Sequence, residues 1–195
     1  MITAIVLSAG ESCRMGTPKA LLPVDDIPFI ERIISVLKST RVGRIVVVLG
    51  HNADEIRRKM EYLPVSIVVN RDYAQGQLSS LHTALNSLGE GKVDGVLVHL
   101  VDHPFLSGSL VDELIERFYA SGKLIVIPRF KGKRGHPVIF SSVLFPELLA
   151  APLDQGARSV VYAHRGDTLE IDTQEEGVVL DIDTPEEYRK RLRRG

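Results

Sequence analysis

Basic side chains stand in a glycine-containing loop close to the start of the chain. Residues 7–19 follow an apolar run and contain Gly10, Arg14, Gly16 and Lys19. Glycine lets the backbone approach a ligand and expose its N–H groups to phosphate oxygens. Arginine can bind phosphate as a bidentate fork, and lysine acts as a mobile point charge. The loop therefore predicts a phosphate cradle, although an ordinary turn with solvated cations would have the same composition.

Two familiar phosphate loops do not fit these residues. A Walker A loop needs Gly-Lys-Ser/Thr, whereas Gly16 is followed by Thr17 and Pro18. A dinucleotide fingerprint needs G-x-G-x-x-G at the start of a helix, and the spacing from Gly10 to Gly16 differs. Both the P-loop ATPase class and the NAD-dependent oxidoreductase class are thereby disfavoured.

Carboxylates follow two later apolar runs. Asp102 comes directly after Val96–Val101, and Asp183 ends a second strand-like run, Val178–Ile182. Mg²⁺ prefers one or two protein carboxylates together with substrate phosphates and water, so this pair predicts a magnesium site. Helix capping is the alternative role for each residue. Asp181 would share a face with Asp183 on a regular strand, so the choice between these two stays open.

Polar and basic segments between the apolar runs could contact the rest of a substrate. Residues 70–81 follow a strand and contain hydroxyls and Gly76, which suit a base and ribose, although Ser79 or Ser80 could instead cap a helix. Residues 129–137 form a loop with four cations within six residues, which suits an acidic acceptor or a solvated surface.

Several of these segments together resemble one family. The loop resembles the L-x-[AG]-G-x-S-x-R-M-G-x-x-K signature of the nucleotidyltransferases that build molybdenum cofactor dinucleotides, the MobA/MocA-like family. Further matches are Asp102-His103-Pro104 to D-x-P, residues 70–81 to N-P-x-x-x-x-G-x-x-x-S-L, residues 134–137 to R-G-[HN]-P, residues 154–158 to G-D-x-G-A-R and residues 181–187 to D-I-D-T-P-E-D. Arg71 replaces the family's proline, and Leu153 replaces its glycine.

The resemblance implies a role for each matching position. Catalytic residues would be Arg14, Lys19 and Asp102, and Asp102 with Asp183 would bind the metal. Nucleotide contacts would come from Leu7, Ser8, Ala9, Gly10, Arg14, Gly16, Lys19, Asn70, Gly76, Ser80 and Asp102. The acceptor would contact Arg134, His136, Pro137, Asp154 and Arg158.

The implied reaction is Mg²⁺-dependent transfer of CMP from CTP to a molybdopterin-type cofactor with release of pyrophosphate. Ala9 and Pro18 resemble the cytidylyl branch, because the guanylyl branch favours glycine and aspartate at these positions. GTP, or a different small phosphate as acceptor, is the alternative within this chemistry. A non-catalytic nucleotide- or cofactor-binding chaperone for a molybdenum enzyme is the alternative from another class, and such an enzyme could also receive the product.

The elements that must position these residues alternate along the chain. Apolar, β-branched runs predict strands at 3–7, 45–49, 65–69, 96–101, 124–127 and 138–140. Helical spacing of apolar residues lies between them, for example at 29–37 and 110–118. This order predicts an α/β protein with a three-layer α/β/α, Rossmann-like nucleotidyltransferase fold and a mostly parallel central sheet. We expect one domain, 1–195, with nucleotide binding in about 1–105 and acceptor binding in about 106–195.

The composition of the chain limits the classes of partner that we expect it to bind. The 195 residues carry 24 Lys plus Arg and 25 Asp plus Glu, a net charge of −1, which argues against nucleic-acid binding through a broad basic surface. The chain has one Cys, no basic leader and no apolar stretch of membrane-spanning length. We therefore expect a cytoplasmic protein that binds neither nucleic acid nor membrane.

Overall fold

A twisted central sheet carries the strand ends that build the site. The computed structural model describes residues 1–12, 14–89 and 92–192. Within them, the sheet runs in the order β10-β7-β9-β6-β1-β4-β5, and β8 pairs with β7. The bounds are β1 (Ile2–Ser8), β4 (Arg44–Leu49), β5 (Ser66–Val69), β6 (Gly95–Leu100), β7 (Ile125–Phe130), β8 (Lys133–Arg134), β9 (Val138–Ser141) and β10 (Thr168–Asp172). Two groups of strands pair in parallel: β10 with β7, and β6, β1, β4 and β5 in that order. Strand β9 lies between the groups and is antiparallel to both β6 and β7.

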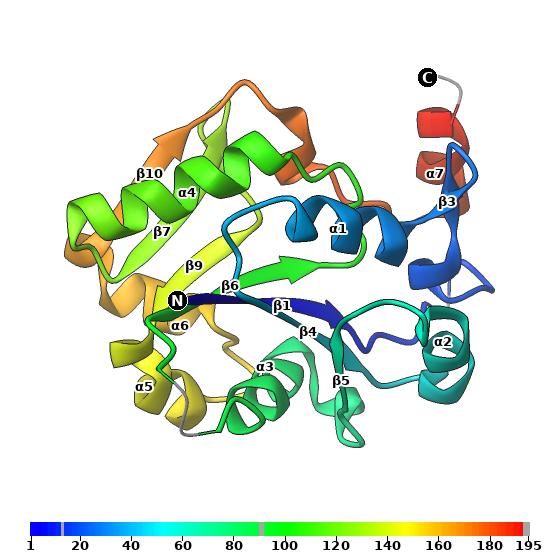
Figure 1. Cartoon of the computed structure of the whole chain (residues 1–195), viewed down its shortest axis with the longest axis horizontal. Coiled ribbons are helices and arrows are strands. Elements are labelled where there is room, and N and C mark those ends of the chain that lie inside the picture. The colour runs from blue at the N-terminus through cyan, green and yellow to red at the C-terminus, as the bar shows by residue number, and fades with distance from the viewer. Residues whose placement is uncertain (13, 90–91, 193–195) are drawn as a thin grey trace.

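Helices cover both faces of this sheet (Figure 1). One face packs against α1 (Phe29–Lys38), α2 (Ala53–Met60) and α4 (Gly108–Ser121), and the other against α3 (Gln77–Asn86), α5 (Phe145–Ala150) and α6 (Arg158–Ala163). In β4, Val47 points into the first core and its neighbours Val46 and Val48 into the second. Strands buried on both faces need apolar residues throughout, which explains the continuous runs. The predicted three-layer, mostly parallel fold is confirmed.

Smaller elements complete the chain. They are the hairpin of β2 (Pro23–Val24) and β3 (Ile27–Pro28), the C-terminal helix α7 (Pro185–Leu192), and the 3₁₀ helices η1 (Lys19–Leu21), η2 (Tyr73–Gln75), η3 (Ser142–Leu144), η4 (Arg165–Asp167) and η5 (Glu176–Val179). Tyr188 anchors α7 by packing edge-on against Phe29 at 6.1 Å between ring centroids. None of the helices in these described ranges is long and apolar enough to cross a membrane.

Two sequence-based assignments were wrong. Residues 178–182 do not form a strand: they pass through η5 and then an extended segment that bonds to loops, with His136 N donating to Val178 O at 2.8 Å. The basic run 129–136 is not a loop but the end of β7 and a hairpin to β8. Lys131 and Gly132 at its tip both have positive φ, 49° and 81°, as a two-residue type I′ hairpin requires.

The register of the sheet brings two chemical segments together. In the parallel pair β1–β6, Leu7 lies beside Leu100, so the first loop and Asp102 leave adjacent strands at the same edge. Ile182 N then donates to Asp102 O at 2.9 Å and holds the segment that carries Asp183 against that edge. Ligands of open α/β sheets bind beyond such carboxyl ends, so this is the expected place for a site.

Candidate active site

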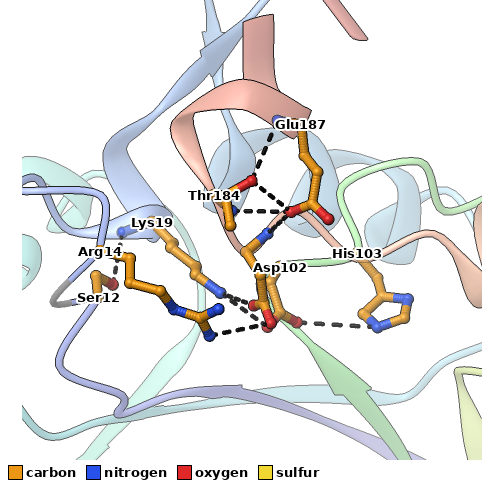
Figure 2. A network of polar contacts seen from close by, with 8 residues as sticks. Ser12, Arg14, Lys19, Asp102, His103, Thr184 and Glu187 are labelled. Carbon is orange, nitrogen blue, oxygen red and sulfur yellow. Dashed lines mark hydrogen bonds and ion pairs between the residues drawn. The ribbon is translucent and has the colours of Figure 1, made fainter. Parts of the chain in front are cut away.

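Two carboxylates and two cations meet at the carboxyl edge of the sheet. Lys19 Nζ lies 3.2 Å from Asp102 Oδ2 and also makes a close ion pair with Asp183 Oδ1. Arg14 Nη2 contacts Asp183 Oδ2 at 3.3 Å. Figure 2 shows Arg14 and Lys19 reaching from the first loop toward Asp102, with His103 on the other side of that carboxylate. The four side chains come from three distant parts of the sequence.

Ion pairing sets the protonation of this cluster. Burial alone would lower the pKa of Lys19, but hydrogen bonds and charge from Asp183 and Asp102 outweigh it and raise that pKa. The hydrogen bond from Lys19, with a further contribution from Arg14, lowers the pKa of Asp183. Lys19 is therefore a full cation and Asp183 a full anion at neutral pH.

The carboxylates suit a hard divalent cation. Asp102 Oδ1 is buried and makes no hydrogen bond within the described residues, while its Oδ2 faces Lys19. In the part of the chain described, no group of three or more His, Cys, Asp or Glu side chains is arranged to hold a metal ion by itself, and Asp102 and Asp183 are the two carboxylates that face Lys19. Such a pair matches Mg²⁺, which takes its remaining ligands from substrate phosphates and water.

Capping is not the role of either aspartate. Ser107 caps α4 by accepting from Leu110 N at 3.4 Å. Thr184 Oγ1 accepts from Glu187 N at 3.2 Å, and Glu187 Oε2 accepts from Thr184 N at 2.9 Å, which together form a capping box. Asp183 therefore faces Lys19 and does not cap a helix. Asp181 is exposed and lies outside the cavity that Asp183 lines.

A first cavity of about 380 Å³ opens beside the charged cluster. Most of the sequence-predicted nucleotide and metal residues line it: Leu7, Ser8, Ala9, Gly10, Arg14, Lys19, Gly76, Ser80, Asp102 and Asp183. Gly16 and Asn70 do not. Gly16 is exposed in the turn of the loop with φ +65°, so it shapes the loop.

Asn70 acts from behind the cavity wall. It is 3% exposed, and its Nδ2 donates to Ser79 Oγ at 2.8 Å and to Ser80 Oγ at 3.0 Å. Neither serine caps α3, because Gly76 occupies the N-cap and Ser79 bonds back to Gly76 O at 2.7 Å. Asn70 therefore orients Ser80, which faces the cavity.

Several lining residues were not singled out from the sequence. Tyr73 faces the first cavity and bonds to His51 Nδ1 at 3.3 Å, with ring centroids 5.8 Å apart. Ser12 Oγ accepts a hydrogen bond from the backbone N–H of Lys19 at 3.1 Å and so fixes the backbone of Lys19. Ser12 belongs to the loop motif and could have been found there, but a lone aromatic residue such as Tyr73 carries no sequence signal.

A second cavity of about 510 Å³ adjoins the first through Leu7 and Gln77. Its rim includes four predicted acceptor residues, Arg134, His136, Asp154 and Arg158; its wall is apolar. The fifth, Pro137, is buried behind the rim after a cis peptide bond and does not line the cavity. The structure thus places four of the five residues predicted to contact the acceptor around one cavity.

Three histidines cluster beside the second cavity, which His136 lines. The rings of His99 and His103 are 6.2 Å apart, and those of His103 and His136 are 5.3 Å apart. Within the described residues, Nδ1 of each has no hydrogen-bond partner. Burial, with the neighbouring histidines, lowers the pKa of His99 to about 3 and that of His136 to about 4. Both rings are neutral at physiological pH.

Comparison with known proteins shows the family of the chain. The sequence model of the MobA-like NTP transferase domain matches residues 4–168. The chain belongs to this family. It is a MobA-like nucleotidyltransferase, as the resemblance of the loop motifs predicted. Cys13, the single cysteine of the chain, belongs to the first loop and lies outside the described residues.

Full-length relatives of the MobA-like chain carry different names. Nicotine blue oxidoreductase of Paenarthrobacter nicotinovorans is 30% identical over 98% of this chain and 96% of its own. Molybdenum cofactor cytidylyltransferase of Escherichia coli (strain K12) is 26% identical over 96% of this chain and 93% of its own. Rv0371c of Mycobacterium tuberculosis H37Rv, solved in complex with manganese, superposes with a TM-score of 0.83 at 28% identity, covering 98% of both chains. One structural neighbour therefore was solved with bound manganese, and the names of the relatives do not specify one acceptor.

Proposed function

We propose that this chain is a Mg²⁺-dependent cytidylyltransferase that transfers CMP from CTP to a molybdopterin-type cofactor. The observation that carries the proposal is the meeting of Asp102, Asp183, Lys19 and Arg14 at the first cavity, which adjoins a second cavity through Leu7 and Gln77. One cavity would hold the nucleotide and the other the acceptor. We assign nucleotide binding to about 1–105 and acceptor binding to about 106–195, with Asp183 contributing across that division.

The chain's own residues would act through charge and position. Asp102 and Asp183 would hold Mg²⁺, which when bound neutralises charge on the triphosphate. The acceptor phosphate oxygen forms a bond to the α-phosphorus of CTP, and the bond to the bridging oxygen breaks, so pyrophosphate leaves with the electron pair. Arg14 and Lys19 lie where they could stabilise the developing negative charge. Preorganised charge and orientation suffice, and no covalent intermediate with the protein is required.

The choice of substrates rests on finer features. Ala9 and Pro18 favour CTP over GTP through their resemblance to the cytidylyl branch. The apolar wall of the second cavity suits a planar ring, and the cations Arg134 and Arg158 at its rim suit a phosphate. A different small phosphate remains the alternative acceptor, because two relatives of similar coverage carry names that do not mention the molybdenum cofactor.

A pyrophosphate-release assay with each NTP, Mg²⁺ and the molybdopterin-type cofactor tests the proposal. We expect release with CTP in preference to GTP, dependent on both metal and cofactor. Pyrophosphate release that occurs only with a different phosphorylated acceptor would show that the molybdopterin-type cofactor is not the acceptor. Absence of release with every NTP would support the non-catalytic chaperone alternative, which the joint presence of Lys19 and the two aspartates disfavours. We place the reaction in the cytoplasm.

A further inference from the structure

Arg134 at the rim of the second cavity is held by a residue outside that cavity. Glu170 Oε1 accepts a 2.8 Å hydrogen bond from Arg134 Nε and a second, close one from Arg134 Nη2. Glu170 lies on β10, at the sheet edge, and does not line the cavity. The bond therefore joins the edge strand to the acceptor rim across 36 residues of sequence.

Glu170 is itself fixed by a second arginine. Its other oxygen, Oε2, accepts from Arg129 Nη1 at 2.9 Å. Arg129 then donates from Nε and Nη2 to the two oxygens of Asp172, at 2.7 and 2.9 Å. Asp172, Arg129, Glu170 and Arg134 form a charge ladder of alternating sign across β10, β7 and β8. A carboxylate held on both oxygens is a rigid anchor, unlike an isolated surface ion pair.

The ladder leaves one edge of Arg134 available. Glu170 occupies the Nε and Nη2 positions, whereas Nη1 has no hydrogen-bond partner within the described residues. The Arg134 side chain is 39% exposed and lines the cavity. An arginine without a partner would lose several rotatable bonds on binding an anion, and a guanidinium already held in place avoids much of that entropic cost.

We propose that Glu170 is a positioning residue that presents the Arg134 guanidinium to the phosphate of the acceptor. This inference rests on the proposed function and names a residue of the edge strand that contributes to its acceptor site. Glu170 itself does not touch substrate. Its effect on the acceptor passes through Arg134, and the nucleotide cavity is independent of it.

A double-mutant cycle separates this role from general stabilisation. We expect R134A to raise KM for the acceptor roughly tenfold, because a charge-assisted hydrogen bond is lost. E170A should raise it roughly threefold to tenfold, and E170A/R134A should match R134A alone, because Glu170 acts through Arg134. E170Q keeps an acceptor oxygen and should recover part of the loss. KM for CTP should change less than about twofold in all four variants.

E116A is the matched control, since Glu116 forms an exposed ion pair with Arg41 at 3.3 Å and lines neither cavity. It should leave both KM values unchanged. Additive effects of E170A and R134A would overturn the proposal, as would an unchanged or lowered acceptor KM in E170A. A lowered value would mean that Glu170 competes with the acceptor.

A readout without substrate keeps this test separate from the test of the activity. Hydrogen exchange at Arg134 Nε, measured by NMR and assigned by its loss in R134K, should be slow in the wild type and E116A and fast in E170A. Equal exchange in the wild type and E170A would overturn the positioning role. A wild type that releases no pyrophosphate would instead overturn the proposed activity, whatever the exchange shows.

Discussion

Lys19 has two roles at the scale of single residues. It lies between the carboxylates of Asp102 and Asp183, which would otherwise repel one another in a partly buried setting. Asp102 Oδ1 makes no hydrogen bond within the described residues and would stay available to a divalent cation. Lys19 therefore keeps the pair assembled without metal and can turn to the phosphates when a metal compensates the carboxylates.

The alternative between Asp181 and Asp183 yields the first prediction. Asp183 contacts Lys19 and Arg14 and lines the first cavity, whereas Asp181 is exposed. D183N should lower kcat for pyrophosphate release by roughly 100-fold, because it removes preorganised charge at the reacting phosphates. D181N, the matched control two residues earlier, should keep wild-type turnover in the same assay. Equal losses in both variants would contradict the assignment.

Gly50 yields a second residue-level prediction. A Cβ there would lie 2.6 Å from Ala9 O and 2.7 Å from Tyr73 Cβ, so the turn after β4 and the first loop would have to separate. G50A should lower the free energy of unfolding by about 1–3 kcal/mol in urea titrations and also weaken nucleotide binding.

G10A is the control for that prediction. Within the described residues, and apart from its chain neighbours, no atom lies within 4 Å of a Cβ at Gly10, so the stability of G10A should stay within about 0.5 kcal/mol of the wild type. Nucleotide affinity should nevertheless fall, because Gly10 lines the cavity. A G50A variant as stable as G10A would show that the contact at Gly50 is not restrictive.

At the scale of elements, the capping box of α7 supports the site. Glu187 Oε2 accepts from the backbone N–H of Thr184 and also from that of Asp183, at 3.0 Å, so the helix start and the candidate metal ligand share one anchor. T184A should cost about 1 kcal/mol of unfolding free energy, because it removes the N-cap acceptor. It should also reduce turnover.

E186A in the same first turn serves as the control for T184A, because Glu186 is exposed and outside the box. Urea unfolding and pyrophosphate release measure both effects. A T184A variant that keeps both wild-type stability and wild-type turnover would contradict the supporting role of the box.

The sequence predicted those elements whose pattern has a single physical cause. Strands buried on both faces are continuously apolar, so β1, β4 and β6 were predicted within one or two residues of their bounds. Strand β10 was missed because Glu170 and Asp172 interrupt its apolar pattern, and their compensation by Arg129 lies far away in sequence. The run 178–182 has the same composition as a strand but bonds to loops, which no local pattern can reveal.

The residues of the candidate site could likewise be predicted only where their pattern has a single physical cause. Strand-end residues and glycine loops have fixed places in an open α/β sheet, so Asp102 and the first loop could be placed next to each other from sequence. The indirect role of Asn70, the ring of Tyr73 and the anchoring of Arg134 depend on tertiary contacts between segments that sequence spacing does not encode.

At the scale of the whole molecule, near-neutrality is an average over separated charges. Acidic residues gather in 167–187, which holds no basic side chain, and basic residues gather at 129–134. The charge ladder shows that part of this separation is used internally, since β10 and the β7–β8 hairpin pair the two kinds of charge. The basic side chains outside this pairing suit a small, local anion site and not a broad basic surface.

The buried histidines predict a pH dependence of global stability. His99 lies beside His103, which in turn lies beside His136, and His103 Nε2 lies 3.9 Å from Asp102 Oδ1. Because the folded pKa values of His99 and His136 are about 3 and about 4, the unfolded chain binds more protons below its ordinary histidine pKa of roughly 6.5. Stability should therefore be greatest above that pH and fall as pH is lowered toward 4.

Urea unfolding at pH 7 and at pH 5 measures this effect. Each neutral histidine should contribute a loss approaching 1.4 kcal/mol per pH unit below about pH 6. H99Q should show a shallower dependence by about one proton. A wild-type stability that is flat between these pH values would contradict the neutral, buried state of the two rings.

The central claim is that Asp102 organises a metal-dependent nucleotidyl transfer in the first cavity. The most direct test measures Mg²⁺-dependent pyrophosphate release by D102A and the wild type, with circular dichroism and urea unfolding as controls for the fold. We predict that D102A loses this release while keeping the wild-type spectrum and a cooperative unfolding transition. Undiminished turnover in a folded D102A would contradict the claim.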